Sequence, residues 1–119
     1  MNTPDEFFGD QALSKELFAT IRRELELLGE VTIRVSKSQI AFRRRRTFAS
    51  VWMPGRYLKG KTAPLVLTVF LPWRDGSCRW KEIVEPSPGR FTHHLELYDG
   101  ADVDDQIRDW LRRAWKAAA

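Results

Sequence analysis

Four consecutive arginines at residues 43–46 interrupt an otherwise apolar segment that spans residues 40–53, and this run constrains the fold most strongly. Successive side chains of a β-strand point to opposite faces of a sheet. An unbroken strand would therefore place Arg44 and Arg46 on the same face as Phe42. Unpaired charges are very costly to bury in a core. A turn or bulge inside the arginine run removes this conflict.

The chain around the arginines changes its hydrophobic period twice. Apolar residues recur at three- and four-residue steps over residues 11–28 and again over residues 103–115, which is typical of amphipathic helices. The intervening chain has the alternating or continuous apolar patterns of strands. The predicted strands cover residues 31–35, 39–44, 46–53, 64–71, 81–85 and 90–98, with residues 64–71 at the centre of the sheet because they are the most apolar.

Local signals predict several boundaries. Thr3 and Glu6 have the spacing of a helix-capping box, which predicts a short first helix. Asp102 is predicted to cap the last helix. The dipeptide Asp75-Gly76 favours a hairpin turn, and the closing residues 117–119 are expected to fray.

The order of helix, antiparallel strands and helix predicts an α+β fold. We expect a two-layer sandwich, in which an antiparallel sheet of about four to six strands is flanked by an N-terminal and a C-terminal helix. The chain of 119 residues is expected to form a single domain, residues 1–119. Its apolar runs are too short to span a membrane, and its N-terminus has no signal-peptide pattern. One cysteine, Cys78, rules out an internal disulfide, so we expect a cytoplasmic location.

The net charge of +4 conceals a strong segregation of charge along the chain. Residues 31–94 carry thirteen bases and three acids, whereas residues 1–30 carry seven acids and three bases, and residues 95–119 carry six acids and four bases. A basic middle between acidic ends indicates an anionic partner, either nucleic acid or an acidic protein.

The arginines are the first candidate site, because the rigid guanidinium fork matches phosphate oxygens. In a meander of strands, a turn at the arginines would lie at the same end of the sheet as Arg74 and Arg79, opposite the loop at residues 56–61. Two structural interpretations remain open: a solvated strand edge or turn, or pairing with acids of the helices, namely Glu24, Glu26, Asp104 and Asp109. The candidate nucleic-acid or anion site comprises Arg43, Arg44, Arg45, Arg46, Arg74 and Arg79.

Aromatic residues and a histidine form the second candidate site. Trp52, Trp73 and Trp80 can line a groove beside the sheet, and His93 can join them in a small-molecule pocket between sheet and helices. His93 has the parity of its apolar neighbours, so it is expected to be buried and hydrogen-bonded to the helix layer. The adjacent His94 points to the other face, which excludes chelation of one metal ion by both. No cofactor is predicted.

Short patterns spread over nearly the whole chain point to a known family. They are Phe8, Leu17-Phe18, the stretch from Lys37 to Phe42, Arg45, Phe48-Ala49, Arg79, the stretch from Arg90 to His93, Trp110-Leu111 and Ala114. With these residues the chain resembles the small, mostly bacterial proteins grouped as domain of unknown function 5655. The resemblance implies a helix-flanked antiparallel sheet. It also favours nucleic acid, because some larger relatives append the domain to nuclease-like modules, and it implies no catalytic residue.

Three hypotheses of function follow from the sequence. The first is a non-enzymatic domain that binds nucleic acid or another anionic partner through an arginine-rich end of the sheet. The second is a protein-interaction module with an aromatic groove, which includes the case of a homodimer. The third is a small-molecule pocket between sheet and helices. An enzyme is the least favoured class, because no pair of residues has an assigned acid, base or nucleophile role.

Overall fold

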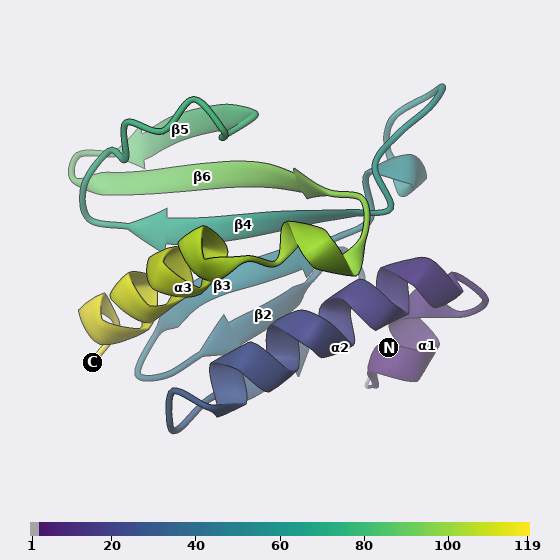
Figure 1. Cartoon of the computed structure of the whole chain (residues 1–119), viewed down its shortest axis with the longest axis horizontal. Helices are drawn as coiled ribbons and strands as arrows, with labels where there is room; N and C mark the ends of the chain where they lie inside the picture. The colour runs from purple at the N-terminus through teal and green to yellow at the C-terminus, as the bar shows by residue number, and fades with distance from the viewer. Residues whose placement is uncertain (1–2) are drawn as a thin grey trace.

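The computed structural model describes residues 3–119, which form two layers (Figure 1). One layer is a six-stranded antiparallel sheet in the order β1-β2-β3-β4-β6-β5, and the helices cover one of its faces. This arrangement confirms the predicted α+β sandwich. The helices are α1 (Pro4–Phe8), α2 (Ala12–Glu26) and α3 (Asp105–Ala117), with short 3-10 helices at Pro54–Arg56 and Gly100–Asp102. The strands are β1 (Thr32–Val35), β2 (Ile40–Arg43), β3 (Thr47–Trp52), β4 (Leu65–Leu71), β5 (Glu82–Ser87) and β6 (Arg90–Leu97).

The arginine run forms the predicted junction between two strands. β2 ends at Arg43 and β3 begins at Thr47, so the remaining three arginines form the turn. The pairing register also shifts next to Phe42, since Phe42 pairs with Ala49 while Arg43 pairs with Thr47. This bulge accommodates the extra residue Phe48 and lets both phenylalanines enter the core. The parity conflict in the sequence is therefore resolved by a turn and a bulge together.

The predicted hairpin at Asp75-Gly76 is wrong. β4 pairs with β6, and β5 pairs only with β6, at the outer edge of the sheet. The segment that follows β4 must therefore cross to the far side of β6 instead of turning back directly. Tertiary contacts hold this crossing: the indole of Trp80 is buried in the core, and its Nε1 donates to the Asp75 carboxylate at 2.8 Å.

Both ends of α3 also differ from the prediction. The cap is Asp104, whose side chain accepts the backbone N–H of Ile107 at 3.1 Å. Asp102 instead belongs to the preceding 3-10 helix, where its carboxylate accepts two backbone N–H groups. The chain end is held as well, because Ala118 is 3% exposed and its carbonyl accepts the backbone N–H of Arg45. The predicted cap of α1 is confirmed, since the hydroxyl of Thr3 accepts the N–H of Glu6.

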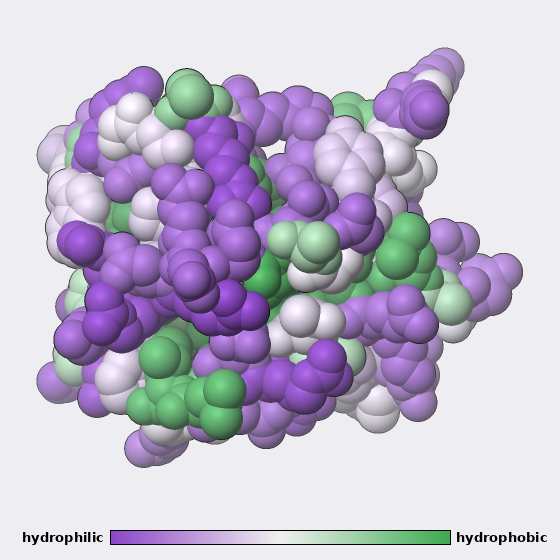
Figure 2. All heavy atoms as spheres, in the orientation of Figure 1, coloured by the Kyte–Doolittle hydropathy of each residue, from purple (hydrophilic) through white to green (hydrophobic). Residues whose placement is uncertain are grey.

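The two faces of the sheet have different surroundings. The helix-covered face and the helices form one hydrophobic core that includes Phe42, Leu67 and Leu111. Seen from the helix side, the surface is mostly hydrophilic, with a small apolar patch at the C-terminal end of α2, where Leu27 is 81% exposed (Figure 2). No helix of residues 3–119 packs on the opposite face, which we call the open face. Within the same residues, no helix has the length and apolar character needed to cross a membrane.

Candidate anion site at the arginine-rich end of the sheet

Two arginines of the turn hold the C-terminal end of α3. The Arg44 guanidinium lies 3.5 Å from the centroid of the Trp115 ring and donates to the Trp115 carbonyl at 3.1 Å. Arg46 makes a longer contact of 3.5 Å with the carbonyl of Ala117. The last carbonyls of a helix lack intrahelical partners and lie at the negative end of its dipole. Arg44 therefore has a structural role, and Arg46 is only weakly engaged.

Arg79 is not part of the arginine cluster. It donates to both carboxylate oxygens of Asp104, at 2.8 and 2.9 Å, and to the carbonyl of Asp102 at 2.7 Å. These contacts place it at the N-terminal end of α3. The hydrogen bond from Arg79 lowers the pKa of Asp104 below its usual value. Of the predicted pairings between arginines and acids of the helices, the one with Asp104 is therefore present, and it satisfies Arg79 internally.

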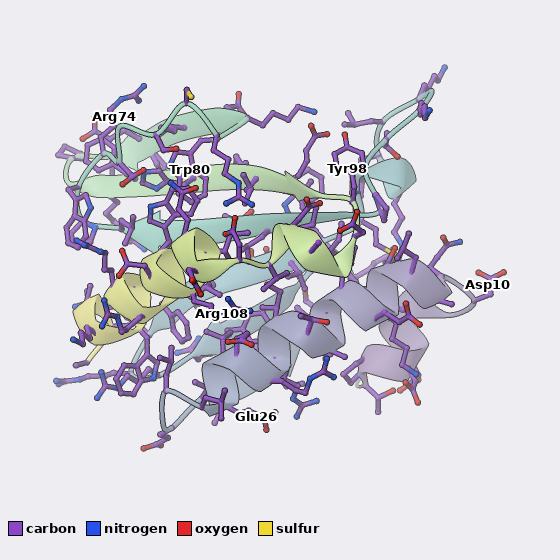
Figure 3. All side chains as sticks on the ribbon, in the orientation of Figure 1. Asp10, Glu26, Arg74, Trp80, Tyr98 and Arg108 are labelled. Carbon is purple, nitrogen blue, oxygen red and sulfur yellow. The ribbon has the colours of Figure 1, made fainter. Side chains whose placement is uncertain are left out.

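Of the other predicted acids, Glu24 and Asp109 pair with bases of the helices themselves, and Glu26 has no ion pair among residues 3–119. Asp109 accepts from Arg112 and Arg113, and its pKa is lowered mainly by these hydrogen bonds. Arg108 bridges Glu24 of α2 and Asp105 of α3. The bridge links the two helices on the side away from the sheet (Figure 3). Of the six arginines of the predicted anion site, only Arg79 therefore has a carboxylate partner among residues 3–119.

A concavity of about 620 Å³ lies at the end of the sheet, between the β2–β3 turn and the β5–β6 hairpin, with the end of β4 in its wall. Arg46 and Arg90 are its charged lining residues, and no acid of residues 3–119 lines it. Phe91 is partly exposed in its wall, whereas Phe70, which also lines it, has the parity of the open face. The C-terminal turn of α3 contributes small side chains. The concavity therefore has an apolar interior and a positively charged rim.

Further arginines surround this end of the molecule. Arg45 is exposed in the β2–β3 turn. Arg74, which Figure 3 labels, is exposed just beyond the end of β4. Arg43 is half-buried and has the parity of the open face. We call Arg45, Arg46, Arg74 and Arg90 the arginine end. Sequence reasoning missed Arg90, although the turn signal Pro88-Gly89 before it indicated a hairpin at this end.

The four residues of the predicted aromatic pocket do not come together. Trp80 and His93 are neighbours in the core, with ring centroids 4.8 Å apart, and Trp80 also packs on Trp110 of α3. Trp52 lies on the open face, as its register with Val66 requires. Trp73 is 41% exposed in the segment after β4. No common pocket is formed by these four side chains.

His93 is fully buried, as predicted, but its hydrogen bonds do not go to the helix layer. Its Nε2 accepts the backbone N–H of Asp75 at 3.0 Å, and its Nδ1 lies 3.3 Å from the carbonyl of Val69. The ring is therefore neutral, with its proton on Nδ1 donated to β4. Burial lowers the pKa of His93. This histidine locks the crossing segment to the sheet and is inaccessible to a ligand.

A second polar network, which the sequence did not reveal, lies on the open face. Trp52 Nε1 donates to the hydroxyl of Thr68 at 3.1 Å, and this hydroxyl lies 2.8 Å from His94 Nδ1. The hydroxyl accepts from the indole, and the tautomer of His94 sets the direction of its contact with the imidazole. Burial also lowers the pKa of His94, which keeps the ring neutral. Thr68 is only 3% exposed, so the network orders side chains and offers no accessible nucleophile.

Residues 3–119 contain no group of three or more histidine, cysteine or acidic side chains able to hold a metal ion.

Comparison with known proteins identifies the chain at the level of its family. The family model described as "Domain of unknown function (DUF5655)" matches residues 5–118. No curated protein and no solved structure matches the chain. Since the match extends over nearly all 119 residues, the chain belongs to this family of domains of unknown function.

Proposed function

We propose that this protein is a non-catalytic module that binds single-stranded nucleic acid at the arginine end. The observation that carries the proposal is the concavity between Arg46 and Arg90, because it combines an apolar interior with a rim that holds only positive charge. A nucleotide has the complementary character, with a flat base and an anionic phosphate. Arginine binds phosphate oxygens with two parallel hydrogen bonds.

The wall of the concavity favours an unpaired base over a duplex. Phe91 offers a partly exposed ring on which a base can stack, and such stacking contributes about 1–3 kcal/mol per base. The bases of a duplex are already stacked and paired, so they cannot enter without being extruded. The volume of about 620 Å³ is sufficient for one or two nucleotides.

The exposed arginines outside the concavity supply the electrostatic part of binding. Arg45 lies in the β2–β3 turn and Arg74 just beyond the end of β4, at the same end of the sheet, so a strand that leaves the concavity meets further guanidinium groups. Contacts to phosphates carry no sequence information. We therefore expect binding with little sequence preference and strong dependence on salt.

The test is a salt series of binding to labelled single-stranded and double-stranded DNA and RNA, followed by fluorescence anisotropy. A variant with Arg45→Ala and Arg90→Ala should weaken single-strand binding and reduce the slope of log K against log salt by about 0.7 for each lost phosphate contact. The matched control is Lys59→Ala with Lys61→Ala, which removes the same charge from the opposite end of the sheet. Absence of binding at low salt, or an equal loss in both double variants, would refute the proposal.

A further inference from the structure

The register of the sheet aligns six side chains in one row across the open face. Pairing runs from Arg34 to Ala41, from Ala41 to Ser50, from Ser50 to Thr68, from Thr68 to His94, and from His94 to Glu82. Residues paired in this way point to the same face of a sheet. The row thus begins with a positive charge at one edge, ends with a negative charge at the other, and has two hydroxyls at its centre.

This row is complementary to itself under one twofold rotation. Two copies can place their open faces against each other about a twofold axis that lies midway between the two sheets and runs parallel to the strands. Given the strand order, the axis places β1 over β5, β2 over β6 and β3 over β4 of the second copy, and it preserves position along the strands. The six residues then face one another as Arg34 to Glu82, Ala41 to His94, and Ser50 to Thr68, each pair occurring twice.

We propose that the open face binds the open face of a second copy of this chain, with this twofold axis. The charged pair brings opposite signs together at both edges of the interface. Ala41 leaves room for the larger imidazole of His94. In the next row, Trp52 of β3 is paired with Val66 of β4 within the sheet. Because the axis places β3 over β4, the half-buried indole of Trp52 faces the small side chain of Val66 in the second copy.

The centre of the row forms the floor of the face and not its contact surface. Ala41, Ser50 and Thr68 are 7%, 1% and 3% exposed, so side chains of the same chain already cover them. The second copy therefore meets the exposed ends of the row, Arg34 and Glu82, and the half-buried side chains of Trp52 and His94.

The positions of Arg34 and Glu82 also favour this axis over the alternative twofold axis, which is perpendicular to the strands. An axis perpendicular to the strands would place β1 over β1 and bring Arg34 against Arg34, which is unfavourable. The chosen axis also directs the arginine ends of both copies to the same side of the dimer. The dimer does not depend on the nucleic-acid proposal, although it would present two binding ends side by side.

The size of the face indicates a dimer of moderate affinity. Six strands about 4.8 Å apart give a face about 24 Å wide, and strands of four to eight residues give a length of about 13–26 Å. Two such faces bury on the order of 1,000 Å² in total, which is near the lower end of stable interfaces. We therefore expect a dissociation constant in the micromolar range, so the mass must be measured over a range of protein concentrations.

The experiment is analytical ultracentrifugation of the whole chain and of charge-reversal variants. Arg34→Glu and Glu82→Arg should each weaken self-association by about tenfold or more, because each places like charges together at both edges. An equimolar mixture of the two variants should recover association, since every edge pair then again has opposite signs. Arg23→Glu, an exposed site on α2, is the control for a change of charge and should leave association unchanged.

Two results would overturn the proposal. One is a monomeric wild-type chain at every concentration up to about 1 mM, which is far above the expected dissociation constant. The other is a dimer that persists in both charge-reversal variants, which would locate the interface elsewhere. Both substituted residues are exposed on edge strands. Thermal unfolding is compared well below the expected dissociation constant, where the wild type is also monomeric, and an unchanged Tm of each variant shows that the fold is intact.

Discussion

Replacement of Arg44 by alanine should destabilise the protein, whereas replacement of Arg45 should not. Arg44 stacks on Trp115 and donates to its carbonyl at the end of α3. Arg45 is exposed, and its one interaction with α3 uses its backbone N–H, which alanine retains. The two adjacent arginines therefore separate a structural role from a role in binding.

The expected loss at Arg44 follows from its contacts. A cation–π contact at a partly exposed site contributes about 0.5–1 kcal/mol. The hydrogen bond from a charged donor contributes about 1 kcal/mol after allowance for the partial exposure of the side chain. We therefore expect Arg44→Ala to lower the free energy of unfolding by about 1.5–2 kcal/mol and Tm by roughly 6–12 °C. Arg44→Lys keeps a charge at the helix end but loses the planar stack, so it should recover about half of the loss.

The assay is urea unfolding followed by far-UV circular dichroism, which is insensitive to the altered environment of Trp115. Arg45→Ala is the matched control, and its free energy of unfolding should stay within about 0.5 kcal/mol of the wild type. An equal effect of the two alanine variants would refute the assigned roles. So would an Arg44→Ala protein as stable as the wild type.

Two further predictions concern positions where the fold has little tolerance. Gly29 has a φ of +145°, and an added Cβ would lie 2.9 Å from Trp115 Cζ2, so Gly29→Ala should destabilise by about 1–3 kcal/mol in urea unfolding. Gly76→Ala, which meets no atom within 4 Å, should leave stability nearly unchanged. Burial lowers the pKa of His93, so this side chain binds a proton more readily in the unfolded chain than in the folded one. The free energy of unfolding should therefore begin to decrease as pH falls below about 6.5, the pKa of an unperturbed histidine. The decrease should continue until pH passes the lower pKa of His93 in the folded state. His93→Gln should therefore have a smaller decrease in unfolding free energy between pH 7 and pH 5, and a decrease as steep as that of the wild type would contradict this assignment.

The sequence by itself determined features that depend on neighbouring residues. The parity conflict at the arginines required an interruption between Phe42 and Phe48, and the structure has both a turn and a bulge there. The amphipathic stripes located α2 and α3, and the parity of His93 placed it in the core. These predictions were correct because a period of two or of 3.6 residues fixes which side chains share a face, whatever the rest of the chain does.

The tertiary structure alone decided the partners of these side chains. Arg44 donates to a carbonyl 71 residues away, and Arg79 donates to the carboxylate of Asp104. In the sequence, these two arginines had been assigned to one basic group. The crossing that places β6 between β4 and β5 also overrode the local turn signal at Asp75-Gly76. The arginine end and the row on the open face arise from this strand order. Charge and hydrogen-bonding groups in a sequence indicate what a side chain can bind, but distances between strands and helices determine which of them are satisfied internally and which remain for a ligand or a second copy.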